Sequence, residues 1–294
     1  MMKDYHSIRE LFEEAEERHC SPGIIACRKE AEQQGIEFDA AWVRMKKMIP
    51  IFSHAIRRGL ADKSKSASGM IGGDANQLCR HEMRFLSPVC RRACAYAIAA
   101  AEANAKMYRI VACPTAGSCG IVPAVLGAAG QEIRATEDEY TRALFTAGAV
   151  GRIAAENASI AGAVGGCQAE CGTAVGMAAA AVVDLYGGST KQMGDALALG
   201  IKNMLGLVCD PVAGLVEVPC VKRNGFGAVA ALTAAEMALA GIRSVIPPDE
   251  VIDAMGKIGK LLPESLRETS QAGLAVTPTG RRITEELHRK LMGS

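Results

Sequence analysis

Hydrophobic positions recur at helical spacing along most of the chain. After Ser7, apolar residues return every three or four positions, and Ser7 with Glu10 forms a capping-box pattern. Similar patterns, often opened by a polar residue or Pro and closed by Gly, predict further helices. We expect them at residues 22–35, 39–60 (kinked or broken at Pro50), 88–109, 136–155, 173–185, 190–206, 227–240 and 248–262.

Strand signals are sparse. The β-branched runs at 110–111 and 216–221 are short and are interrupted by Pro or Cys. We therefore predict an all-α fold with a single large helical domain, in which residues 1–60 form an N-terminal helical arm packed on a main body of residues 61–294. An α/β fold stays open as the alternative, because Ala-rich helices and buried parallel strands have similar patterns.

Composition and charge narrow the function classes. The 294 residues are 49% hydrophobic, which allows a sizeable core, and the formal charge is only +1. That balance argues against binding nucleic acid or an anionic membrane through bulk charge, and aromatic residues, at 4%, offer few stacking platforms for bases. The longest uncharged run, 110–131, contains two prolines and suits a membrane span poorly. Residues 1–18 lack an apolar leader, so we expect a cytoplasmic protein.

The eleven cysteines are the most informative feature of the composition. A cytoplasmic protein keeps its thiols reduced, so they indicate either metal or redox chemistry or small buried hydrophobic side chains. No CxxC pair occurs, and spacing alone leaves a metal site of Cys167, Cys209 and Cys220 open beside the structural interpretation. Cys167 follows Gly165 and Gly166 where a helix is expected to begin, and free N–H groups there stabilise a thiolate.

Loops that mix Gly or Pro with Ser, Thr, Cys or Asp separate the predicted helices, and such loops commonly carry function. They span residues 62–75, 113–120, 157–172, 208–220 and 267–280. Lys65, between two serines in the first of them, is either a pyridoxal-phosphate lysine or a solvated loop residue.

Four of these motifs together resemble one family. They are SASGMIGGDA at 66–75, GCQAE at 166–170, NMLGLVCDPVAGLVEVPCVKRN at 203–224 and RETSQAGLAVTPTG at 267–280. In collinear order they look like the iron–sulfur L-serine dehydratases, in particular the separate α subunit of the two-chain form.

The resemblance implies a helical domain whose loops converge on one [4Fe-4S] cluster. Its three ligands, carried over by motif, are Cys167, Cys209 and Cys220, and one iron stays open for substrate. The resemblance further implies β-elimination of water from L-serine, giving pyruvate and ammonia. A missing Ser-His-Thr motif implies that the catalytic base lies on a separate β subunit. The chain ends in Leu-Met-Gly-Ser, without the terminal Cys by which some members inhibit themselves.

Residues in two loops are candidates for holding the substrate. We expect Asp74 to pair with the ammonium group of serine, and loop N–H groups or Lys65 to bind its carboxylate. The other candidates are Ser66, Ser68, Gly69, Thr115 and Ser118. Lys202, Arg223 and Asn224 are close in sequence to cysteine ligands, where they can orient substrate or donate to cluster sulfurs, or serve only as caps and surface charges.

Other functions fit parts of the same pattern. They are a cysteine desulfhydrase that uses the same cluster, a pyridoxal-phosphate dehydratase that uses Lys65, and a non-catalytic serine-binding partner subunit. We also expect the protein to be an oligomer.

Overall fold

The computed structural model describes residues 4–82 and 84–292, and within them the regular structure is helical. No strand forms in these residues, where the only ladder contact is an isolated bridge between Cys209 and Arg267. The prediction of an all-α fold is therefore confirmed.

The helices are α1 (Ile8–Glu17), α2 (Pro22–Gln34), α3 (Phe38–Lys46), α4 (Met48–Ala61), α5 (Asp74–Arg80), α6 (Pro88–Ala105), α7 (Ile121–Ile133), α8 (Glu137–Asn157), α9 (Gly162–Gly165), α10 (Thr173–Leu185), α11 (Thr190–Lys202), α12 (Cys220–Leu239), α13 (Pro248–Leu261) and α14 (Pro278–Met292). The shorter turns are the π-helical η1 (Gln168–Gly172) and the 3-10 turns η2 (Val212–Gly214), η3 (Glu264–Leu266) and η4 (Gly273–Val276).

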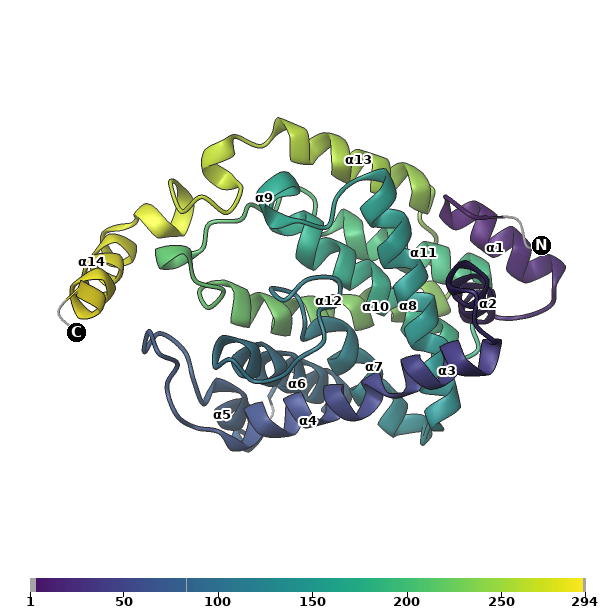
Figure 1. Ribbon diagram of the computed structural model, residues 1–294, viewed down its shortest axis with the longest axis horizontal. Coiled ribbons are helices and arrows are strands. Elements are labelled where there is room, and N and C mark those ends of the chain that lie inside the picture. The colour runs from purple at the N-terminus through teal and green to yellow at the C-terminus, as the bar shows by residue number, and fades with distance from the viewer. Residues whose placement is uncertain (1–3, 83, 293–294) are drawn as a thin grey trace.

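Helix α10 lies at the centre of the molecule. Every one of its residues is buried, and α7, α8, α11 and α12 pack around it (Figure 1). Its sequence, TAVGMAAAAVVDL, is apolar on all sides, as expected of a helix without a solvent face. The loops that precede α10 and α12 therefore start from a rigid, buried scaffold.

Small residues let the outer helices approach closely. At Gly59 in α4, a Cβ atom would stand 1.9 Å from the carbonyl oxygen of Ala99 in α6. The backbones of α4 and α6 meet at this point because neither residue carries a bulky side chain. The high Ala and Gly content thus sets the helix spacing as well as the helix propensity.

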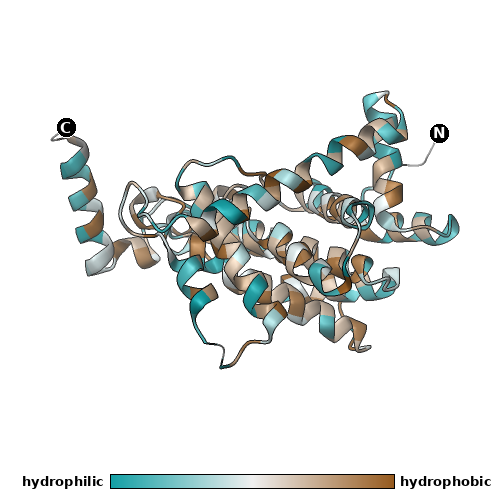
Figure 2. Ribbon diagram, turned by 90° about the horizontal axis from the view of Figure 1, so that it is seen from below, coloured by the Kyte–Doolittle hydropathy of each residue, from teal (hydrophilic) through white to brown (hydrophobic). Residues whose placement is uncertain are grey.

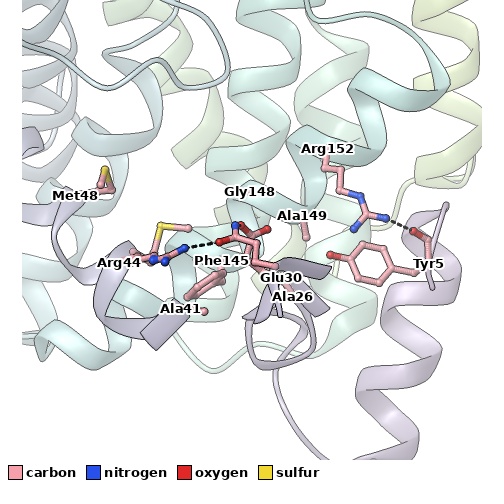
Figure 3. Close-up of a pocket in the computed structure, with 12 residues that line it drawn as sticks. Tyr5, Ala26, Glu30, Ala41, Arg44, Met48, Phe145, Gly148, Ala149 and Arg152 are labelled. Atoms are coloured by element: carbon pink, nitrogen blue, oxygen red, sulfur yellow. Dashed lines mark hydrogen bonds between the residues drawn. The ribbon is translucent and has the colours of Figure 1, made fainter. Parts of the chain in front are cut away.

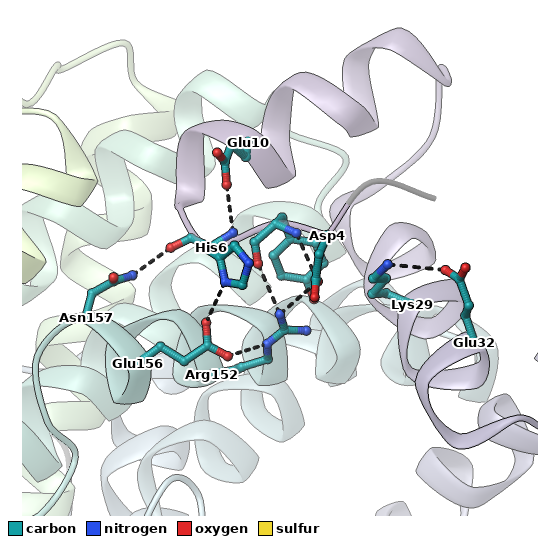
Figure 4. A network of polar contacts seen from close by, with 9 residues as sticks. Asp4, His6, Glu10, Lys29, Glu32, Arg152, Glu156 and Asn157 are labelled. Atoms are coloured by element: carbon teal, nitrogen blue, oxygen red, sulfur yellow. Dashed lines mark hydrogen bonds and ion pairs between the residues drawn. The ribbon is translucent and has the colours of Figure 1, made fainter. Parts of the chain in front are cut away.

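The N-terminal segment is fastened to α8 by polar contacts (Figure 4). Arg152 donates to the carboxylate of Asp4 at 3.0 Å and to the carbonyl oxygen of Tyr5 at 3.1 Å. The Asn157 amide donates to the carbonyl oxygen of His6 at 2.7 Å. These contacts orient α1, whose buried side chains then join the same core as those of α8.

Helix α14 extends away from the body at the end opposite to the N-terminus (Figures 1 and 2). It contacts mainly η2 and η4, which belong to the loops near the candidate site. Figure 2 shows polar and apolar residues alternating along it. Within residues 4–82 and 84–292, every helix is too short or too polar to cross a bilayer.

Most predicted helices are confirmed, including several of their ends. Ser7 caps α1 by accepting a bond from the Glu10 amide, and Ser21 caps α2, which ends at a left-handed Gly35. Thr136 and Glu139 form the predicted capping box of α8. Helix α10 has the predicted bounds, and α13 ends one residue early.

Other boundaries were wrong, and each error has a local cause. The break predicted at Pro50 within 39–60 is present but lies at Lys47, between α3 and α4, because Pro50 falls in the first turn of α4, where its missing N–H costs no helical bond. Helix α6 stops at Ala105, before a left-handed Met107, and α11 stops at Lys202, before a left-handed Gly206. Helix α12 begins at Cys220, seven residues before the predicted start. Helices α5, α7, α9 and α14 were not predicted.

Residues of α2, α3, α4 and α8 line a hollow of about 300 Å³ (Figure 3). None of the site candidates from the sequence lines it. Gly148, in the middle of α8, faces this hollow, and a Cβ atom added there would have no heavy atom within 4 Å. Packing therefore does not require a glycine at this position.

We predict that Gly148→Ala raises the free energy of unfolding by about 0.5–1 kcal/mol, because alanine in a helix interior loses less backbone entropy than glycine. Urea denaturation followed by circular dichroism measures the change. Gly59→Ala is the matched control, since its new Cβ would collide with the Ala99 carbonyl and should destabilise the protein. A loss of stability in Gly148→Ala would contradict the prediction.

Candidate functional site

The first turn of α12 is the point where the predicted site loops meet. Cys220 is its first residue, directly after Pro219. The next side chains contact different segments: Lys222 reaches Asp74, while Asn224 donates from Nδ2 to the carbonyl oxygen of Gly117 at 2.7 Å. One helix end therefore connects the start of α5 and the loop at 113–120 to a cysteine.

Several cysteines from separate segments lie together beside this helix end. Cys167 immediately precedes η1, and its Sγ lies 3.5 Å from Sγ of Cys171. Cys209 also lies within hydrogen-bonding reach of Cys167. Thiol hydrogen bonds from Cys171 and Cys209, together with Arg223, hold the pKa of Cys167 well below its usual value. Burial raises the pKa of Cys220 to about 12, and the charge of Cys167 acts in the same direction.

Arg223 ties the cysteines to a buried ion pair. Its guanidinium donates to the carbonyl oxygen of Val208 at 2.9 Å and to Asp210 at 3.0 Å, and it also bonds Cys167. Asp210 accepts a further bond from the Leu274 amide at 2.8 Å. The pair thereby joins the loops at 208–220 and 267–280 and places positive charge beside the Cys167 sulfur.

The loop at 113–120 carries hydroxyl groups to a carboxylate near the cysteines. The Thr115 hydroxyl donates to Oε1 of Glu170 at 2.7 Å, and Oγ of Ser118 lies 3.2 Å from Oγ1 of Thr115. A Cβ atom at Gly162 would stand 2.9 Å from Oε2 of Glu170 and 3.2 Å from Sγ of Cys209, so the missing side chain leaves both groups uncovered. Burial raises the pKa of Glu170 to about 7, although the Thr115 hydrogen bond lowers it.

The loop at 62–73 is held by a second carboxylate. Ser66 donates to Oε2 of Glu217 at 2.7 Å, and Ser68 donates to the same oxygen. Gly69 is exposed and left-handed in the turn that follows. Lys65, next to this turn, is also exposed.

Asp74 is the first residue of α5, and both its backbone amide and its side chain are bonded to other helices. Its amide donates at 2.8 Å to Glu102, a fully buried carboxylate in α6. Its side chain forms an ion pair with Lys222. Burial alone would raise the pKa of Asp74, but the hydrogen bond and the charge of Lys222 outweigh burial and lower it.

The structure thus sorts the residues singled out from the sequence. It brings Cys167 and Cys209 together, puts Arg223 against both Cys167 and Asp210, and places Thr115 at Glu170, with Ser118 against Thr115. Lys202 does not join them, because its ammonium group donates to Ser244 at 2.9 Å. Gly293 and Ser294, at the end without a terminal Cys, lie outside the described residues.

Four acidic or basic groups of the site were missed. Glu170, Asp210, Glu217 and Lys222 all stand inside motifs that were singled out, yet no role was given to them. Glu102 was missed as well, although a lone charge in the alanine-rich run of α6 is a signal, since an unpaired charge in a buried helix is costly.

Sulfur is the main donor in this cluster of side chains. Among the described residues, no three His, Cys, Asp or Glu side chains are gathered tightly enough to hold a single metal ion. An iron–sulfur cube presents separate iron atoms to separate thiolates, so its ligands need not meet around one point. The donor set, with one thiolate favoured and an arginine beside it, fits such a group.

Comparison with known proteins gives one consistent family. The family model described as "Serine dehydratase alpha chain" matches residues 10–275. The chain is 47% identical over 293 residues to "Probable L-serine dehydratase, alpha chain" of Bacillus subtilis, covering 99% of this chain and 97% of that relative. It is 37% identical over 284 residues to "L-serine dehydratase, alpha chain" of Peptoniphilus asaccharolyticus, covering 96% and 97%. It also matches 40% of "L-serine dehydratase 1" of Escherichia coli, at 46% identity over 183 residues.

We predict that Asp210→Ala lowers the free energy of unfolding by about 2–4 kcal/mol, because it leaves the Arg223 guanidinium half-buried without its carboxylate. The two side chains of this pair are only 6% and 17% exposed. Urea denaturation of the protein without added iron measures the change.

Asp253→Ala is the control for that experiment. It removes a carboxylate from the pair with Lys257, whose side chains are 57% and 71% exposed, and such surface pairs contribute at most about 1 kcal/mol. Equal losses in the two variants would show that the Asp210 pair is not a special support of the site.

Proposed function

The chain belongs to the serine dehydratase alpha chain family, and on that premise we propose that it is the α chain of a two-chain enzyme converting L-serine to pyruvate and ammonia. The observation that carries the proposal is the meeting of Cys167 and Cys209, from separate loops, with Arg223 of the helix turn that begins at Cys220. In this proposal the protein binds one [4Fe-4S] cluster through Cys167, Cys209 and Cys220.

When bound, a cluster with three protein ligands supplies an iron with an open position, a Lewis acid for the serine hydroxyl. The residues around the cysteines suit such a centre. Arg223 bonds the Cys167 sulfur, where its positive charge favours the thiolate, and Sγ of Cys171 lies 3.5 Å from the same sulfur. Asn224 holds the start of α12 against the loop at 113–120, so that the surrounding backbone is fixed in advance.

The substrate groups require complementary charges, and the loops of the candidate site carry both signs. Glu170 is the carboxylate next to Cys209, and we assign to it the ammonium group of serine, with Thr115 and Ser118 completing that side. Lys65 and the loop N–H groups around Gly69 are left for the substrate carboxylate. Asp74 already pairs with Lys222, so it acts on the substrate through that pair.

Removal of the Cα proton needs a positioned base. The chain lacks the Ser-His-Thr motif to which the family resemblance assigns this role, so we place the base on a separate β chain. The names of the full-length relatives, which are alpha chains, support the presence of such a partner. Loss of the proton and the hydroxyl leaves an enamine, which tautomerises and hydrolyses to pyruvate and ammonia.

We predict that Cys167→Ser, Cys209→Ser and Cys220→Ser each lower the bound iron and acid-labile sulfide after anaerobic reconstitution, because a hydroxyl is a poor substitute for a thiolate ligand. Cys90→Ser is the control, since that residue lies in the first turn of α6. Circular dichroism checks that each variant is folded. Full iron and sulfide content in all three ligand variants would contradict the assignment.

We also predict that the iron-loaded chain forms pyruvate from L-serine rapidly only when the β chain is added, since the base is supplied from there. A coupled lactate dehydrogenase assay follows the product. Pyruvate from L-cysteine in preference to L-serine would instead favour the desulfhydrase. Binding of serine without turnover would favour a non-catalytic partner, and a yellow, borohydride-sensitive protein would favour the use of pyridoxal phosphate through Lys65.

A further inference from the structure

The carboxylate of Glu217 is buried between two loops that are far apart in the sequence. Its residue is 5% exposed, three positions before Cys220, and its carbonyl oxygen accepts the Val221 amide of α12 at 3.0 Å. From the other loop, Ser66 and Ser68 both donate to its Oε2 atom, with Ser66 at 2.7 Å and itself 6% exposed. The carboxylate therefore links the loop at 62–73 to the start of α12.

The two hydroxyl groups are committed to this link. Both hydroxyl oxygens lie within hydrogen-bonding distance of Oε2 of Glu217 and 3.0 Å from each other, so their two protons are used within this group of three side chains. The oxygen of Ser68 also accepts the Met70 amide at 3.0 Å, which shapes the turn. Ser66 and Ser68 therefore cannot donate to a substrate carboxylate while this arrangement holds.

Glu217 is bound by hydroxyl donors and by no cation. Within the described part of the chain, no lysine, arginine or histidine nitrogen forms an ion pair with it. A buried carboxylate normally requires a charged partner or several donors. The site thus uses Glu217 as an oxygen acceptor, a role that an amide oxygen can also fill.

The far end of the same loop is held by a different group. Glu102 accepts the Gly73 and Asp74 amides at 3.3 and 2.8 Å. Glu102 therefore supports the end of the loop at 62–73, and Glu217 supports it near its middle. Lys65 and the exposed turn at Gly69 lie next to the Glu217 support.

We propose that Glu217 is a positioning residue that holds the loop at 62–73 against the cysteine-bearing end of α12 by accepting hydrogen bonds from the Ser66 and Ser68 hydroxyls. This role requires an oxygen acceptor at position 217 and no negative charge. This inference rests on the proposed function only for its effect on serine. Through the loop, Glu217 sets where Lys65 and the Gly69 turn stand relative to Cys220. The two serines then act on the substrate indirectly, by way of the loop.

The first test uses the full chain without iron and measures amide hydrogen exchange in the peptide covering 63–73. We expect Glu217→Ala to speed exchange there on the order of tenfold or more, because two buried hydroxyls lose their acceptor. Glu217→Gln should exchange like the unchanged protein. The matched control is Glu286→Ala, which removes an exposed carboxylate paired with Arg282 on α14. Unchanged exchange in Glu217→Ala, or equal loss in Glu217→Gln, overturns the proposal.

A double-mutant cycle identifies the partners. In a chain that carries Ser66→Ala and Ser68→Ala, adding Glu217→Ala should have little further effect on exchange in 63–73, because the interaction is already absent. A full additional effect would show that Glu217 acts through other groups and would overturn the proposed link.

The second test uses the iron-loaded chain with its β chain. We expect Glu217→Ala to raise KM for L-serine on the order of tenfold while iron and sulfide content stay unchanged, and Glu217→Gln to restore KM. A fall in kcat and iron content without a change in KM would show a merely structural role. If the unchanged protein makes no pyruvate but the exchange results hold, the proposed function fails and the loop support stands.

Discussion

A helix end can reach several neighbours at once, because successive side chains leave the axis about 100° apart. The first turn of α12 uses this geometry. Cys220 lies at its first position, Lys222 contacts Asp74, Arg223 contacts Cys167 and Asp210, and Asn224 contacts the loop at 113–120. The rest of the site depends on this turn, since its side chains bond the start of α5, the segments around Cys167 and Asp210, and the loop at 113–120. The buried helix α10, against which α12 packs, keeps the turn in place.

The buried or half-buried carboxylates of the site are all stabilised in the same way, by hydrogen-bond donors from other segments. Each of these carboxylates receives donors from another segment of the site: Glu102 from Gly73 and Asp74, Glu170 from Thr115, and Asp210 from Arg223 and Leu274. An unsatisfied buried carboxylate would cost several kcal/mol, so each acid favours the one loop arrangement that satisfies it. The loops are therefore ordered by hydrogen bonding, where the helices are ordered by apolar packing.

Three of the six non-glycine residues with positive φ in the described part of the chain lie in the same region. Ala213, Glu268 and Ser270 have left-handed φ values between 56° and 65°, a conformation that disfavours residues with a side chain. The Glu268 amide donates to the carbonyl oxygen of Cys209 at 2.8 Å, and Ser270 donates to the Pro211 carbonyl oxygen at 2.7 Å. These bonds compensate for the strain, and they give the Cys209 loop a fixed course beside the Cys167 loop.

The sequence by itself determined the all-α fold, the caps of α1, α2 and α8, and the bounds of α10, because these follow from local periodicity and local hydrogen bonds. Its motifs also pointed to the cysteines and to the loops that carry them. Only the tertiary structure decided which groups meet there. The link of Ser66 to Glu217 spans 151 positions, and that of Thr115 to Glu170 spans 55. Such pairings arise when packed helices bring loop ends together, and no local pattern along the chain encodes that distance.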